Sequence, residues 1–383
     1  MTHSNQIKSL GVLTFNDEGI LFAGDNLSGA VIAFDFKAEK RTTNQFEINV
    51  YDIDEQIGAI LGTTQGNVQL NDLAVHPKSG EVYLSVTYGH GAEALPTLIK
   101  VDVKNQLHVL DLATLEITVQ RLHNLPDNDR KLALRGTGGG APTTKEIAKS
   151  KRSLRTLAIV AMQYHKDELF VAGISNEEFC SVLRRIPYPF NGKESVSNIE
   201  MYHITHDKYE SRAPIRSMVV KEIDGIDQLI AAYTCSPLVL IPLNELKDGT
   251  KVKARTIGDM GNGQPIDIIP FTLKGEEMLF VTNKSRSPLV IPVRGLLNAK
   301  VVTHKDFERG PKLDLNPLMP FGPMGKPIMF TGASLHMGLL NEKQFVSLNR
   351  DATAGSLDLE TVFTMFPFKL HDIIGEWDIP GND

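Results

Sequence analysis

An internal repeat is the feature of this sequence that most restricts its fold. The segment Pro214 to Val239 aligns without a gap on the segment Pro265 to Val290, at a shift of 51 residues. Both copies start with Pro-Ile and end with Ser-Pro-Leu-Val. Between these ends, each copy has a short strand, a polar turn, a second apolar strand, a polar corner and a third strand. The pattern predicts a strand meander that recurs along the chain.

Weaker copies of the same unit begin near residues 10, 71, 154 and 333. Repeats of this length are typical of a β-propeller, in which four-stranded antiparallel blades close into a ring and protect their edges. We therefore predict an all-β fold with a single β-propeller domain over residues 1–383. Inner strands can be identified near residues 10, 70, 155, 213, 264 and 333, which gives six blades, whereas dividing the chain by the period gives about seven. Seven blades are favoured, and six are the alternative.

Two segments interrupt the repeat. Residues 124–153 combine a glycine cluster with a basic run, which predicts a long insertion at the surface. Residues 308–325 are rich in Pro, Gly and Met and are expected to be irregular. Neither resembles a domain boundary, so both are interpreted as loops of one propeller.

Charge and hydropathy exclude several classes of partner. The net charge is −6 and the Lys and Arg residues are scattered, which argues against nucleic acid and anionic lipid as partners. The apolar runs are far shorter than the roughly 20 residues that cross a bilayer. The N-terminus lacks the features of a signal peptide, which favours the cytoplasm, with a periplasmic or secreted location as the alternative if a leader has been removed. Cys180 and Cys235 are too few for a disulfide framework, and their redox state stays open.

Two blades carry a family resemblance. The segments DEGILFAGD-x(4)-AVIAFDF, from Asp17, and NDLAVHPKSGEVYLS, from Asn71, resemble blades of the YVTN-repeat and quinoprotein amine dehydrogenase β-chain-like propellers. They resemble more distantly those of gluconolactonase and strictosidine synthase relatives. The resemblance implies the fold but no single activity, because such families include redox-enzyme subunits, lactonases and binding modules. A gluconolactonase-like cation site is not transferred, since Asp25, Asn71 and Asp72 are suitably placed but the expected glutamate is absent.

Propeller geometry predicts which residues share one face of the disc. The corner between the second and third strands of each blade, and the segment leading into the next inner strand, emerge on the same side, where rigid strands commonly support a ligand site. The candidate catalytic residues there are Cys235, Arg216, Glu177 and Glu178, and the candidate cofactor-binding residues are Asp72, Arg155, Asp267 and Arg286. Cys235 could be a thiolate nucleophile or a small buried apolar residue. The Asp and Arg residues could instead pair across blades and cap the channel.

Histidines supply the candidate metal ligands. His203, His206 and Glu210 lie close together in the sequence, and His90 is added as a further ligand from another corner. Imidazole with carboxylate suits copper, iron or zinc. On a straight strand His203 and His206 would point to opposite faces, so they can share one ion only if the chain turns between them. A hydrogen-bonding role without metal is the commoner alternative.

The last inner strand adds one more histidine. His336 is expected to face the channel. Four methionines lie near it in the sequence: Met319, Met324, Met329 and Met337. Their thioethers together with imidazole would suit copper, although packing in the core is the commoner role of such residues.

No known catalytic motif decides between the functional hypotheses, so whether the chain is an enzyme stays open. The first hypothesis is an enzyme, or a component of a redox enzyme, that binds a small molecule or metal at the channel mouth. The second is a non-catalytic propeller whose rim docks a protein or a ligand. A lactonase-like metal-dependent hydrolase is the third.

Overall fold

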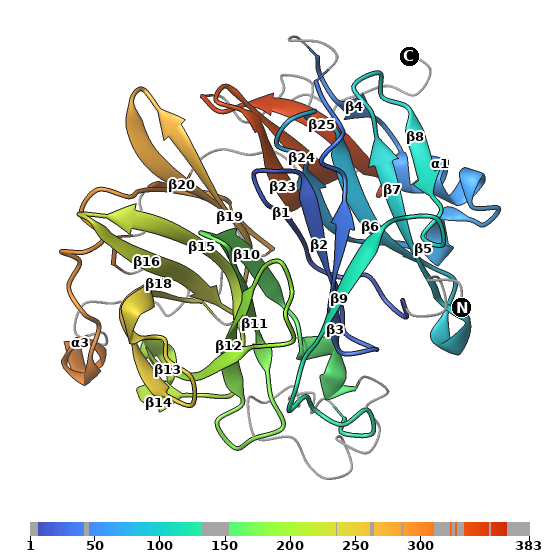
Figure 1. Cartoon of the computed structure of the whole chain (residues 1–383). Helices are drawn as coiled ribbons and strands as arrows, with labels where there is room; N and C mark the ends of the chain where they lie inside the picture. The colour runs from blue at the N-terminus through green and yellow to red at the C-terminus, as the bar shows by residue number, and fades with distance from the viewer. Residues whose placement is uncertain are drawn as a thin grey trace.

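The chain folds into an all-β, propeller-like arrangement of four-stranded antiparallel sheets (Figure 1). The computed structural model describes residues 7–41, 46–131, 153–234, 236–260, 264–284, 287–309, 322–323, 326–327, 333–351 and 354–365. None of the helices in these ranges is long and apolar enough to cross a membrane.

The described strands form six antiparallel units, which we name blades A to F in the chain order of their inner strands. Blade A consists of β1 (Leu13–Phe15), β2 (Ile20–Asp25), β3 (Ala30–Asp35) and β9 (Ile117–Arg121). Blade B consists of β5 (Val68–Val75), β6 (Val82–Tyr88), β7 (Leu95–Val101) and β8 (Leu107–Leu110). Blade C consists of β10 (Ala161–His165), β11 (Glu168–Ile174), β12 (Ser181–Pro187) and β13 (Ser195–His203), with β14 (Lys208–Glu210) paired to β13.

The remaining blades follow the same order from the channel outward. Blade D consists of β15 (Ile215–Ile223), β16 (Ile226–Tyr233), β17 (Pro237–Pro242) and β18 (Lys251–Asp259). Blade E consists of β19 (Pro265–Leu273), β20 (Glu276–Asn283), β21 (Leu289–Pro292) and β22 (Lys326–Pro327). Blade F consists of β23 (Ala333–Asn341), β24 (Gln344–Arg350), β25 (Leu357–Phe363) and β4 (Asn49–Val50). The two copies of the 51-residue repeat are therefore β15 to β17 and β19 to β21, as the alignment predicts.

Short helices lie between strands. Among the described residues the α-helices are α1 (Ile53–Ile60) and α3 (His304–Arg309). The 3₁₀ turns are η2 (Gln65–Asn67), η3 (Gly91–Glu93), η4 (Leu154–Leu157), η5 (Ile204–His206) and η6 (Leu243–Glu245). The sequence placed an inner strand near residue 155, but Arg155 lies on η4 and the strand β10 begins six positions later, at Ala161.

The inner strands contact one another in a closed ring. Strand β1 contacts β5 and β10, β5 contacts β23, β23 contacts β19, β19 contacts β15, and β15 contacts β10. A separate hydrophobic cluster fills each of the six interfaces between neighbouring blades. The second strand of a blade is therefore covered on both faces, which is why β2 is buried along its whole length.

The order of blades around the ring differs from their order in the chain. Blade B lies between blades A and F, because the chain leaves β3, adds β4 to the outer edge of blade F and then builds blade B. It returns through β9, which completes blade A by pairing with β3. The buried Thr361 supports this closure, since its Oγ1 accepts a hydrogen bond from the Ile48 N–H at 2.8 Å and donates to the Ile48 carbonyl at 3.1 Å.

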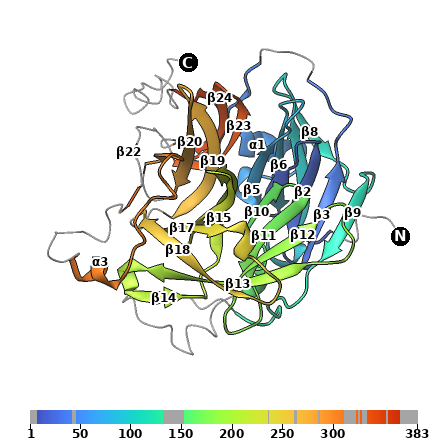
Figure 2. The same cartoon turned by 60° about the vertical axis from the view of Figure 1, so that its left-hand side comes forward.

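Blades C and D are also joined at their outer edges. Strand β13 pairs in parallel with β18, with Asn198 opposite Lys251 and Met201 opposite Ala254. This pairing merges two blades into one nine-stranded sheet. Figure 2 shows β13 and β14 in the lower part of the view, with β18 above them beside β17. The parallel register brings the ends of β13 and β18 to the same side of the disc.

Candidate functional site

Three ionisable side chains from three neighbouring inner strands meet at the channel. Asp72 is on β5 of blade B, His336 on β23 of blade F and Asp267 on β19 of blade E. The Nδ1 atom of His336 lies 3.0 Å from Asp72 Oδ1 and 3.3 Å from Asp267 Oδ2. The three offer ligand atoms that all lie within 4.8 Å of one another. We call this set the channel cluster.

β-bulges in the inner strands set the direction of these side chains. The pairing of β5 with β6 shifts between Leu70 and Asp72, and that of β23 with β24 shifts between Ser334 and His336. The pairing of β19 with β20 shifts between Pro265 and Ile268, a stretch that includes Asp267. Such β-bulges redirect side chains and are common beside active sites. Each member of the channel cluster therefore lies in or next to a bulge.

Backbone donors hold the two carboxylates in place. Asp72 Oδ2 accepts the N–H of Leu13, on the neighbouring strand β1, at 2.7 Å. Asp267 Oδ2 accepts the N–H of Met337, on the neighbouring strand β23, at 2.9 Å. Each carboxylate thus links two adjacent blades before any ligand is considered.

The charges in the channel cluster favour a protonated histidine. Burial by itself lowers the pKa of His336, but the charges of Asp267 and Asp72 outweigh it and raise that pKa to about 10. The His336 contacts are ion pairs by distance but do not have the alignment of good hydrogen bonds. The side chains stay partly exposed, at 12% for Asp72, 13% for His336 and 22% for Asp267, so a small ion can reach them.

A second cluster lies at the outer edge of blade C. His203 ends β13, His206 ends the turn η5, and Glu210 ends β14. The Nδ1 atoms of His203 and His206 lie 3.1 Å and 2.7 Å from separate oxygens of Glu210. The 3₁₀ turn between the histidines, followed by Asp207 at a φ of 48°, is the turn that a shared ion requires. We call this set the hairpin cluster.

The histidines of the hairpin cluster perturb Glu210. Burial by itself raises the pKa of Glu210, but the hydrogen bonds and charges of His203 and His206 outweigh burial and hold that pKa at about 2. Glu210 is therefore a carboxylate throughout the physiological range.

The structure assembles only part of the predicted sites. Asp72 and Asp267 do come together, and so do His203, His206 and Glu210. His90 does not join them, because it is an exposed residue at the β6 to β7 corner of blade B. Cys235 and Arg286 lie outside the described residues.

The other predicted residues are separate from both clusters. Arg155 donates from Nε to Asn128 at 3.2 Å, and Glu177 accepts from Asn124 at 2.6 Å. Glu178 is exposed at the same corner as Glu177. Arg216 lies within the bulge of β15, at the repeat position equivalent to Asp267, and is partly exposed. These residues therefore do not converge with either cluster.

Sequence reasoning missed two residues. His336 was expected to face the channel, yet its pairing with two aspartates was not foreseen. Its place on the last predicted inner strand was the available signal. Asp259, at the end of β18, lies 3.6 Å from the Nε2 of His203 and has no local sequence signal. Met337 is buried in the core between blades E and F, in agreement with the core interpretation. Met319, Met324 and Met329 lie outside the described residues.

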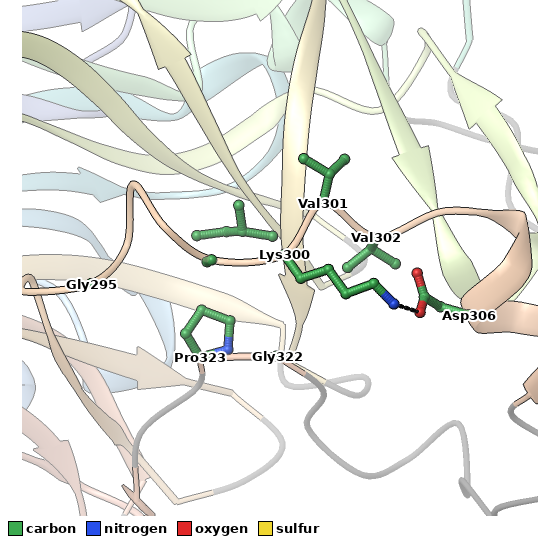
Figure 3. A pocket seen from close by; sticks show the side chains of 9 residues that line it. Gly295, Lys300, Val301, Val302, Asp306, Gly322 and Pro323 are labelled. Carbon is green, nitrogen blue, oxygen red and sulfur yellow. Dashed lines mark hydrogen bonds and ion pairs between the residues drawn. The ribbon is translucent and has the colours of Figure 1, made fainter.

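A pocket of about 290 Å³ lies elsewhere, beside β18 (Figure 3). Its walls are mostly apolar and include Ile257, Val302 and Pro323. The ion pair of Lys300 with Asp306 lies at one side. No member of either cluster lines this pocket, so it is not part of the candidate sites.

Comparison with known proteins finds distant similarity to solved structures. No family model matches the sequence, and no curated protein matches it. Similar solved structures include U3-55K, at 7% identity and a TM-score of 0.38, covering 92% of this chain and 95% of that one. The β-propeller domain of Myceliophteria thermophila Cps50 (Swd1) is similar at 11% identity and a TM-score of 0.33, covering 93% and 84%. Kuenenia stuttgartiensis hydrazine synthase is similar at 10% identity and a TM-score of 0.35, covering 94% and 97%.

Proposed function

We propose that this protein is a single-domain, six-bladed β-propeller that binds a divalent metal ion at the mouth of its central channel. The observation that carries the proposal is the convergence of Asp72, Asp267 and His336 from three adjacent inner strands. The proposal takes six blades, the alternative to the seven favoured by the period, and the closed ring of inner-strand contacts supports this count. Membership of the YVTN-repeat and quinoprotein amine dehydrogenase β-chain-like family rests on the two blade motifs alone.

The donor set and its spacing fit a metal ion. Ligand atoms about 2.1 Å from a shared ion lie about 3.0 to 3.4 Å from one another. The distances from His336 Nδ1 to Asp72 Oδ1 and Asp267 Oδ2 are 3.0 and 3.3 Å. Two carboxylates and one imidazole suit manganese, iron or zinc. A bound ion would supply Lewis-acid chemistry for a small ligand with oxygen donors.

Neighbouring residues support a ligand at this rim. Arg216 occupies the equivalent position on β15, and its guanidinium adds positive charge for an anionic group. Asn71 is already engaged, since its Nδ2 donates to the Leu10 carbonyl and to Thr87 Oγ1, each at 2.8 Å, and its Oδ1 accepts from Gln69 Nε2 at 3.0 Å. A lactonase-like site that uses Asn71 is therefore not part of this proposal.

Calorimetry with Mn²⁺ tests the proposal on the full chain. Asp267→Asn removes the negative charge of the ligand and keeps an oxygen that can accept the Met337 N–H. The variant should therefore lose the binding of one Mn²⁺ ion per chain. Asp227→Asn is the matched control, because Asp227 also has a 22% exposed side chain and lies 3.3 Å from a histidine, His165. It should bind as the wild type does.

Proton release gives a second readout. Since His336 is protonated at neutral pH, an ion that takes its Nδ1 must displace the proton. Titration at pH 7.5 in buffers of different ionisation enthalpy should therefore report release of about one proton per ion. If Asp267→Asn binds Mn²⁺ like the wild type, or if the wild type binds none, the metal proposal is wrong. The channel cluster is then an ion-paired closure of the ring, and the alternative of a non-catalytic binding propeller is favoured.

A further inference from the structure

We propose a second, independent metal site at the outer edge between blades C and D, where the hairpin cluster of His203, His206 and Glu210 binds a first-row transition ion such as Zn²⁺. The site is on β13, η5 and β14, whereas the channel cluster is on the inner strands of blades B, E and F. It therefore does not depend on the proposed function.

The three ligand atoms already have the spacing of a coordination sphere. His203 Nδ1 lies 3.1 Å from Glu210 Oε2, and His206 Nδ1 lies 2.7 Å from Glu210 Oε1. One ligand atom from each residue can be chosen so that all three lie within 4.8 Å of one another. The imidazole centroids are 4.3 Å apart, so both rings approach the same point. Two imidazoles and a carboxylate are a common ligand set of zinc sites that keep a fourth position open.

A further carboxylate lies beside the buried histidine. His203 Nε2, on the side of the ring away from Glu210, lies 3.6 Å from Asp259 Oδ2. Asp259 is itself held by the Ser236 hydroxyl, which donates to Oδ1 at 2.5 Å. Histidines that bind metal through one ring nitrogen usually direct the other to such a carboxylate, which fixes the tautomer that leaves the metal-binding nitrogen free.

The surrounding strands make the site rigid. The parallel pairing of β13 with β18 ends just before His203, and Thr256 of β18 donates from Oγ1 to the Tyr202 carbonyl at 2.8 Å. On the other side of the turn, the Tyr202 hydroxyl donates to Asp207 Oδ1 at 2.6 Å. The two histidines are thus positioned by both blades rather than by the loop alone.

Access to the cluster is from solvent. The side chain of His203 is 2% exposed, but those of Glu210 and His206 are 16% and 24% exposed, so an ion and a water ligand can enter from that side. The Lys208 ammonium lies 3.5 Å from Glu210 Oε1 and competes with an ion for that carboxylate. Because the Lys208 side chain is 59% exposed, it can move away into solvent when an ion binds.

Zinc titration and cobalt spectroscopy on the full chain test this proposal. His206→Ala removes a partly exposed ligand and should lower bound Zn²⁺ by one ion per chain, with loss of the visible Co²⁺ absorption of the site. His108→Ala is the control, because His108 is an exposed histidine that also contacts a carboxylate, Asp102, at 2.9 Å. It should retain both signals. Asp259→Asn should weaken Zn²⁺ binding about 10- to 100-fold.

A further variant separates metal binding from a merely structural network. Lys208→Ala removes the competing cation and should strengthen Zn²⁺ binding, whereas a hydrogen-bonded network without metal gives no such gain. Asp267→Asn should leave this site intact, so failure of the channel proposal and failure of this one are distinguishable. Unchanged Zn²⁺ stoichiometry and affinity in both His206→Ala and Glu210→Gln would overturn the proposal.

Discussion

Replacing His336 with glutamine tests the electrostatics of the channel cluster. Without a metal ion, His336 is expected to carry a positive charge between Asp72 and Asp267. His336→Gln leaves these two carboxylates near each other without the cation. We expect the variant to fold but to be less stable at neutral and mildly acidic pH, because two partly buried negative charges then repel one another.

The size of the effect follows from linkage. The pKa of His336 rises from 6.5 to about 10 on folding, and each pKa unit corresponds to about 1.4 kcal/mol. Because the folded-state pKa lies above the unfolded one, this stabilisation is complete below about pH 6.5 and is lost as the pH rises through about 10. The shift sets an upper limit of about 5 kcal/mol, and partial exposure reduces the expected value to about 2 to 4 kcal/mol.

Urea denaturation in EDTA at pH 6 and pH 10.5 measures this difference. The free energy of unfolding of His336→Gln is compared with that of the wild type at each pH, so that other groups that titrate at alkaline pH contribute equally to both. The deficit of the variant should shrink at pH 10.5. His108→Gln, at an exposed pair with Asp102, should cost less than about 1 kcal/mol. An equal deficit at both pH values would refute a protonated His336.

Two further predictions concern the ring. Thr361→Val removes both hydrogen bonds between the Thr361 side chain and the backbone of Ile48. It should therefore lower the free energy of unfolding by about 1 to 3 kcal/mol in urea titration. A loss below about 0.5 kcal/mol would mean that β4 does not need these two hydrogen bonds. Gly173→Ala should cost more than about 3 kcal/mol, because a Cβ there would lie 2.0 Å from the Ala158 carbonyl oxygen. Gly66→Ala is the control, because a Cβ there meets no atom within 4 Å, and its free energy of unfolding should stay within about 0.5 kcal/mol of the wild type in urea titration. Equal effects of the two glycine variants would contradict the packing argument.

The hairpin cluster could be located from the sequence, but its geometry could not. His203, His206 and Glu210 lie within eight positions, so any compact turn brings them near one another. Whether both imidazoles face one point depends on the 3₁₀ turn and on Asp207 at positive φ, which the letters alone do not specify. The partner of His203 on β18, Asp259, lies 56 positions away and is brought there by the parallel pairing of two blades.

The channel cluster shows the same limit more strongly. The sequence predicts that Asp72 and Asp267 lie at the rim and that His336 faces the channel, but not which of them are neighbours. Equivalence in a repeat gives the height of a residue in the channel, whereas the angle between two residues depends on the order of the blades. Blade B lies between blades A and F and not between A and C, so Asp72 is next to His336. Arg155 was expected at the same rim but lies on η4, one turn before its strand.

The sequence by itself determined the blade, because the meander of strand, turn and strand is encoded by residues that are near one another in the chain. It also predicts that the corners between second and third strands share one face of the disc, since strand direction alternates in a fixed way within each blade. Only the tertiary structure decided the order of blades, the sharing of outer strands β4 and β9, and the pairing of His336 with two aspartates. Those features depend on contacts between residues far apart in the chain, and ring closure selects them through packing between whole blades.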